Sequence, residues 1–202
     1  PYGEVKVALA PGKKIVMAPV VSPGTVSKSG YAYVLEASDY NVHKAIYLMQ
    51  SAGVFVQSAT RPFTASISGK SMFFGYGSLS IPVGLQRISA DSIYRVVDNV
   101  SKTCGITIHG LSTGFSAGGI DLGSNYMRTL KKPEAAMIIG TGVAAPEAGE
   151  IWHLLDQRLQ MPVTKLDVLT LPRVNLNRYN TLIMVSGNYS LLDKTLTDKI
   201  KT

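Results

Sequence analysis

The chain has 202 residues, of which 46% are hydrophobic and 16% charged, and its formal net charge is +7. This balance is typical of a folded protein with a sizeable core and excludes an intrinsically disordered chain. No apolar run reaches the roughly 20 residues of a membrane-spanning helix, and the single cysteine, Cys104, excludes a disulfide framework. The basic residues are scattered, with adjacent pairs only at 13–14 and 131–132, so we expect no nucleic-acid partner and no membrane span.

The first thirty residues are rich in proline and glycine and contain two short apolar runs, at 5–9 and 15–18. This pattern predicts an extended entry segment with one or two strands. The chain starts at Pro1, without a methionine and without the layout of a signal peptide. We therefore expect that these residues belong to a longer polypeptide.

A regular pattern begins with residues 31–35, which predict a strand. Ser38 and Asp39 can cap a following helix, and Gly53 can end it. Residues 54–56 predict the next strand. The expected helix carries its apolar face on Val42, Ala45, Ile46 and Met49.

A β-hairpin is expected next, because two β-prone runs at 63–67 and 71–74 flank a polar turn that contains Gly69. Residues 79–83 are predicted to continue this hairpin. Pro82 cannot donate a backbone hydrogen bond and therefore marks a strand edge.

A second helix is predicted to start after Ser89 and to end at Gly105, followed by a strand at 106–108. Residues 110–124 are rich in glycine and serine, which suits a surface loop. The resulting order of elements predicts an α+β module that spans residues 1–132.

Residues 133–202 predict a second, α/β domain with a parallel sheet. Strands are expected at the short apolar run 136–139 and at 162–167 and 181–185, and residues 191–201 predict a final amphipathic helix. A parallel sheet of three strands with an open edge predicts that the domain continues beyond the last residue.

A helix is expected between the first two of these strands. Pro146 suits its first turn, and Glu147 and Glu150 suit the positive end of its dipole. Its apolar face comprises Ala148, Ile151, Trp152, Leu155 and Leu159.

Catalytic and metal-binding patterns are missing from the sequence. His43, His109 and His153 fall on separate predicted elements, without the spacing of a zinc site. Cys104 follows a helix pattern, and Ser186 lacks the two glycines that surround a nucleophilic serine in a strand-to-helix turn. We therefore assign no catalytic residue, no metal ligand and no cofactor within this chain.

Gly140, Gly142 and Ala145 fit the pattern G-x-G-x-x-A that binds dinucleotides after a strand. Asp167 ends the next strand, where a ribose-binding acid would lie. Pro146 argues against this alternative, because it places the helix start later than such a site requires.

Because ligands bind at the carboxyl ends of parallel strands, we expect any small ligand of the second domain at that edge. The candidate residues there are Gly140, Thr141, Gly142, Glu147, His153 and Ser186.

Four tracts of the second domain, 139–143, 147–158, 161–164 and 179–189, resemble the C-terminal region of bacterial zinc carboxypeptidase-like proteins. In that family a domain similar to class I glutamine amidotransferases follows the peptidase domain. The first module is similar to the module between those domains, through residues 31–35, 39–41, 74–84 and 119–124.

The resemblance implies a flavodoxin-like fold for residues 133–202, with the domain truncated in this chain. It implies an accessory role beside a zinc-binding peptidase domain upstream of Pro1, and a periplasmic or extracellular location. The alternative is an amidotransferase-like hydrolase whose nucleophilic cysteine lies beyond Thr202. Ser186, Gly187 and Asn188 depart from the double glycine of that family, which favours a non-catalytic relative.

Overall fold

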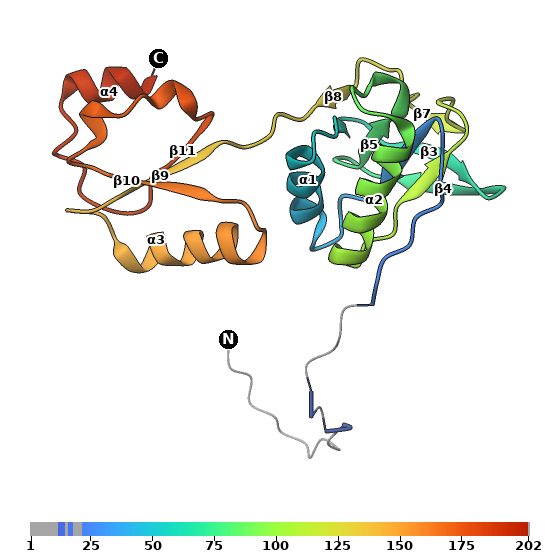
Figure 1. The fold of residues 1–202 in the computed structure, drawn as a ribbon, viewed down its shortest axis with the longest axis horizontal. Helices are drawn as coiled ribbons and strands as arrows, with labels where there is room; N and C mark the ends of the chain where they lie inside the picture. The colour runs from blue at the N-terminus through green and yellow to red at the C-terminus, as the bar shows by residue number, and fades with distance from the viewer. Residues whose placement is uncertain (1–11, 15, 18–21, 202) are drawn as a thin grey trace, which may run out of the picture.

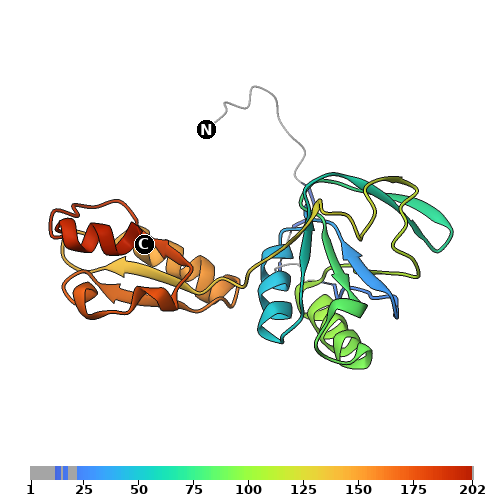
Figure 2. The same ribbon diagram turned by 90° about the horizontal axis from the view of Figure 1, so that it is seen from above.

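The computed structural model describes residues 12–14, 16–17 and 22–201, so the apolar run at 5–9 and parts of that at 15–18 lie outside the described residues. The protein is a mixed α/β structure with two antiparallel sheets and one parallel sheet. Figure 1 shows two units, one on each side of the segment 130–134, and Figure 2 shows the same separation from above.

The first unit is built on a five-stranded antiparallel sheet in the order β6-β1-β5-β2-β8. Two helices pack together beside it and share a hydrophobic core with it. The elements are β1 (Ala32–Leu35), α1 (Val42–Ser51), β2 (Gln57–Ala59), β5 (Leu79–Pro82), the 3₁₀ turn η1 (Val83–Leu85), α2 (Ala90–Cys104), β6 (His109–Leu111) and β8 (Met127–Thr129).

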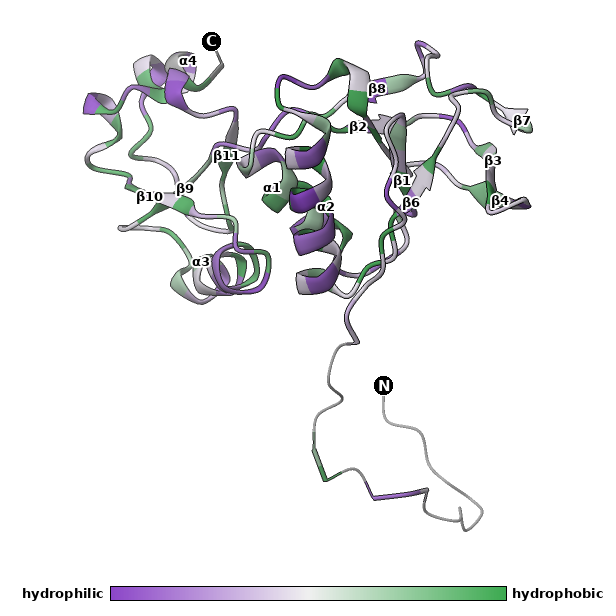
Figure 3. Ribbon diagram, turned by 45° about the vertical axis from the view of Figure 1, so that its right-hand side comes forward, coloured by the Kyte–Doolittle hydropathy of each residue, from purple (hydrophilic) through white to green (hydrophobic). Residues whose placement is uncertain are grey.

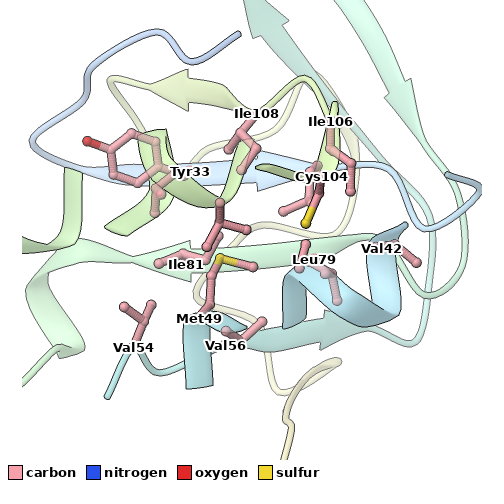
Figure 4. Packing of buried hydrophobic residues seen from close by; sticks show 14 of the residues in the cluster. Tyr33, Val42, Met49, Val54, Val56, Leu79, Ile81, Cys104, Ile106 and Ile108 are labelled. Atoms are coloured by element: carbon pink, nitrogen blue, oxygen red, sulfur yellow. The ribbon is translucent and has the colours of Figure 1, made fainter. Parts of the chain in front are cut away.

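Figure 4 shows this core between the sheet and the helices, where Tyr33, Leu79 and Ile81 face Met49 and Cys104. The buried positions of α2 recur at helical spacing, and Figure 3 shows hydrophilic residues along its outer side. Burial of this apolar face stabilises the unit by about 25 cal/mol for each Å² removed from water. The buried residues of α2 are Ile93, Val97, Val100, Ser101 and Cys104.

Both ends of α2 follow the expected capping rules, and α1 ends as expected before Gly53, with φ of 79°, but the start of α1 differs from the expectation. Ser89 Oγ accepts from the Ser92 N–H, and Gly105 ends α2 with φ of 70°. The expectation that α1 begins at Ser38 and Asp39 is wrong. Asp39 instead accepts from the Asn41 N–H in a turn, and the helix begins after Asn41.

A smaller antiparallel sheet, in the order β4-β3-β7, packs through its apolar face against the sheet face opposite the helices. The predicted hairpin is confirmed, and its two-residue turn has positive φ at Ser68 (50°) and Gly69 (79°). Phe63 and Phe74 stack with ring centroids 4.9 Å apart. The strands are β3 (Phe63–Ile67), β4 (Lys70–Phe74) and β7 (Gly118–Gly119).

The expectation that residues 79–83 continue this hairpin is wrong. Residues 79–82 form β5, which lies between β1 and β2 in the five-stranded sheet. Pro82 is tolerated in this central strand because it is the last residue, where the strand passes into η1.

Two other predicted strands are displaced by three residues. Val54 and Val56 are buried, but the Phe55 backbone bonds the side-chain amide of Gln86 instead of a neighbouring strand. The strand expected at 106–108 begins three residues later, as β6. Ile108 itself forms only an isolated bridge with Val26. Side-chain and loop partners satisfy these backbone groups, which local sequence cannot reveal.

The second unit contains a parallel sheet in the order β10-β9-β11, which confirms the three predicted strands. Helices α3 and α4 cover opposite faces of this sheet (Figure 1). The elements are β9 (Ala135–Ile139), α3 (Ala145–Trp152), β10 (Val163–Asp167), the 3₁₀ turns η3 (Leu171–Arg173) and η4 (Leu176–Arg178), β11 (Thr181–Ile183) and α4 (Lys194–Lys201).

Helix α3 starts with Pro146 in its first turn, as expected, and continues into a π-helical segment, η2 (His153–Arg158). In a π-helix each N–H bonds the carbonyl five residues earlier, and the Leu159 N–H donates in this way to the Leu154 carbonyl at 3.0 Å. Gln160 then adopts a left-handed conformation with φ of 55°. Ala148, Ile151, Trp152 and Leu155 pack on the sheet as predicted.

Candidate functional site

Two glycines shape the turn at the carboxyl end of β9. Gly140 and Gly142 have φ of 101° and 86°. A Cβ at Gly140 would lie 2.6 Å from Asp167 Oδ2, and one at Gly142 would lie 2.5 Å from the Asn188 carbonyl oxygen. Both the left-handed backbone and the close neighbours therefore require glycine here.

The loop that follows β11 closes over this turn. The Ala144 N–H donates to the Ser186 carbonyl, and the Asn188 N–H donates to the Gly142 carbonyl, each at 2.9 Å. Val143 and Gly187 form an antiparallel bridge between the two loops. The loops at the ends of two parallel strands thus form one hydrogen-bonded edge.

Glu147 completes this edge from the first turn of α3. Its Oε2 accepts a 2.9 Å hydrogen bond from the Ser186 N–H, across 39 residues of sequence. The carboxylate lies where the helix dipole favours negative charge. The Ser186 amide, a group that could otherwise stabilise an oxyanion, is therefore already bonded to a carboxylate.

The sequence-derived site residues are only partly brought together. Gly140 and Gly142 lie within the hydrogen-bonded edge with Glu147 and Ser186, and Thr141 lies between the glycines. His153 comes after the last residue of α3, roughly 9 Å along the helix from Glu147 at 1.5 Å per residue. The structure does not bring it together with the strand-end residues, because five residues of helix lie between Glu147 and His153.

The same geometry argues against a dinucleotide phosphate at this turn. The N–H groups of Val143 and Ala144 already donate to carbonyls, and Pro146 has no N–H. A phosphate at the start of α3 would also meet the Glu147 carboxylate. One oxygen of Asp167, Oδ1, also accepts a hydrogen bond from the Leu169 N–H at 2.8 Å.

An apolar pocket of about 360 Å³ lies on the α3 side of the sheet, beside this edge. Lys165 of β10 reaches over Trp152 of α3, with its Nζ 4.9 Å from the ring centroid. Sequence reasoning missed this pocket, although the lysine in the middle of the strand predicted at 162–167 was the available signal. The lining residues are Met137, Ile139, Gly140, Val143, Ala145, Ala148, Gly149, Trp152 and Lys165.

Two side chains that could act as nucleophiles when ionised, Cys104 and Tyr189, have raised pKa values. Burial raises the pKa of the Cys104 thiol, which lies in the core of the first unit. Burial also raises the pKa of Tyr189, with a smaller contribution from Glu147, and the Tyr189 hydroxyl donates to the Val185 carbonyl at 2.7 Å. Both groups thus favour their neutral forms.

Among the described residues, no group of three histidine, cysteine or acidic side chains could hold a metal ion. In the same part of the chain, every helix is too short or too polar to cross a membrane. Comparison of the chain with known protein families, curated proteins and solved structures finds no match.

Proposed function

We propose that this chain is a non-catalytic accessory region of a bacterial zinc carboxypeptidase-like protein, periplasmic or extracellular, that positions or regulates the peptidase domain. Zinc would be bound by that domain, outside these 202 residues. The second unit would be a flavodoxin-like domain related to class I glutamine amidotransferases.

The strand order supports the proposed fold of the second unit. Its strands are arranged β10-β9-β11, so the first strand in sequence lies between the second and the third. A flavodoxin-like sheet begins with this order, 2-1-3. The crossover from β9 through α3 to β10 also pairs the two strands in parallel, as that fold requires.

The closed carboxyl edge of the second sheet is the observation that carries the proposed role. Ligand-binding and catalytic groups of open α/β sheets gather at this edge. Here the described residues use it for bonds between the two loops and for the contact of Glu147 with Ser186. An edge stabilised in this way suits a rigid support better than a reaction site.

The alternative is an amidotransferase-like hydrolase whose nucleophile lies beyond residue 202. One observation favours it: the segment 186–188 lies at the carboxyl end of β11, next to the turn that begins α3. A loop in that place could contribute an oxyanion donor if Glu147 released the Ser186 amide.

The test begins with the mass and peptide map of the natural polypeptide, followed by activity assays. We expect zinc-dependent carboxypeptidase activity in the natural polypeptide and none in residues 1–202 alone. Turnover by the 202-residue chain would contradict the accessory role. Glutamine hydrolysis by the natural polypeptide that iodoacetamide abolishes would support the alternative, because Cys104 is buried and cannot supply that thiol in the folded protein.

A further inference from the structure

The pocket between α3 and β10 has the dimensions and the lining of a small-molecule site. Its volume of about 360 Å³ falls within the usual range for ligand pockets, roughly 300–1,000 Å³. Met137 and Ile139 form its floor on β9, and Ala145, Ala148 and Trp152 contribute from α3. An apolar body of moderate size would fit there.

Lys165 is the charged residue in the lining, and it makes no ion pair with the described residues. Its ammonium group lies over the Trp152 ring, beside the apolar surface of the pocket. Asp167 follows two positions along the same strand, but its Oδ1 accepts from the Leu169 N–H and its Oδ2 lies against Gly140. The pocket therefore offers one cation without a carboxylate partner.

Gly149 gives a second, independent indication. A glycine inside a helix costs about 1 kcal/mol relative to alanine. Neither the backbone nor packing requires it, because its φ is not positive and an added Cβ would meet no atom within 4 Å. The missing side chain leaves the α3 side of the pocket open.

We infer that this pocket binds a small amphipathic monoanion, an aromatic or branched apolar acid whose body packs against Trp152 and Met137 while its carboxylate meets Lys165. This inference is independent of the proposed function, since an accessory region could serve with or without a ligand.

The test compares 3-phenylpropanoate with 3-phenylpropanamide, which differs from it only in the charged group. Binding to the 202-residue chain is measured by isothermal titration calorimetry and by the fluorescence of Trp152, the chain's single tryptophan. We expect saturable binding at one site, with the acid binding tenfold or more tightly than the amide, the size of a charge-assisted hydrogen bond.

Two variants assign this binding to the pocket. Lys165→Met should remove the preference for the acid and leave binding of the amide unchanged. Gly149→Leu should abolish binding of both compounds, because the new side chain enters open space that the ligand needs. Lys194→Met, on the helix that covers the opposite face of the sheet, is the matched control and should bind like the original protein.

Circular dichroism confirms that each variant is folded before its binding is interpreted. Equal affinity for acid and amide, failure of both to bind, or an unchanged preference in Lys165→Met would each overturn the inference. Sedimentation velocity tests the other occupant, a second copy of the chain. A dimer that Gly149→Leu dissociates, without ligand binding, would show that the pocket is a subunit interface.

Discussion

At the level of single residues, Glu147 connects two segments of the second unit that are distant in sequence. Replacing it with alanine removes the acceptor of the Ser186 N–H and a favourable charge at the start of α3. We expect Glu147→Ala to lower the free energy of unfolding by about 1–2 kcal/mol. Urea denaturation followed by Trp152 fluorescence measures this change.

The control is Glu150→Ala, one turn further along the same exposed helix surface. Within the part of the chain that the structure describes, the Glu150 side chain has no hydrogen-bond or ion-pair partner, so its loss should change the unfolding free energy by less than about 0.5 kcal/mol. Equal effects of the two substitutions would show that the bond to Ser186 contributes nothing beyond helix charge.

His109 makes the stability of the first unit depend on pH. Burial lowers the pKa of this imidazole, and Glu36 opposes the effect more weakly. Near and below pH of about 6.5 the unfolded chain binds the proton more readily than the folded one. This contribution to stability is therefore complete above that pH and is lost as pH falls toward the lower folded pKa.

We expect the melting temperature to fall more steeply between about pH 7.5 and 5.5 in the original protein than in His109→Gln. The exposed His43 supplies the control, and His43→Gln should retain the original slope. If the melting temperature changes with pH equally in all three proteins, His109 is not the source of the pH dependence. Differential scanning calorimetry across this range measures the slopes.

Some site residues could be predicted from sequence because parallel strands bring their carboxyl ends together. This rule placed Gly140, Glu147 and Ser186 at one edge. It could not indicate the contact between Lys165 and Trp152, which depends on how α3 lies on the sheet. It also does not apply to His153, which follows α3 and lies at the opposite end of that helix from Glu147.

At the level of secondary structure, the end of η2 stores conformational strain. Gln160 has φ of 55°, a region that costs a residue with a Cβ about 1 kcal/mol and costs glycine nothing comparable. The larger entropy of glycine in the unfolded chain offsets about 0.4–1 kcal/mol of this relief, so we expect Gln160→Gly to raise the free energy of unfolding by up to about 0.5 kcal/mol. Thermal or urea unfolding measures the gain.

Gln157→Gly is the matched control, because it places the same residue inside the helical segment. There glycine should lower the unfolding free energy by about 0.5–1 kcal/mol. Destabilisation by both substitutions would mean that Gln160 is not strained in solution.

Helices and the second sheet were predictable because their signals are local, such as Ser89 and Gly105 at the ends of α2. The strands of the first unit were harder, because their partners lie far away in sequence. Gln86, for example, bonds both backbone groups of Phe55 and keeps this residue out of the sheet. Strand β8 was missed because Met127–Thr129 has no apolar alternation of its own.

At the level of the whole molecule, each end of the connecting segment is attached to a different unit. The Leu130 N–H donates to the Val56 carbonyl in the first unit. The Asn180 side chain of the second unit bonds the Lys132 carbonyl and the Glu134 N–H. Lys131 lies between these attachments and is exposed.

We therefore expect limited trypsin digestion to cut the described part of the chain first after Lys131, leaving two folded pieces that unfold separately. Mass spectrometry identifies the cut, and calorimetry follows each piece. A hydrogen bond between the units runs from Arg158 to the Tyr40 hydroxyl. It is 3.4 Å long and exposed, so Arg158→Ala should leave both transitions unchanged. A single cooperative transition that is lost on cleavage would contradict two independent units.

The strand order of the first unit also has a consequence for the newly made chain. Strand β1, near the start of the unit, pairs with β5 and with β6, and its sheet is completed by β8. A ribosome must therefore release almost the whole unit before the first strand has both neighbours. During that time its apolar residues are exposed to other chains, so the first unit, rather than the more local second one, should be the part that depends on chaperones during synthesis.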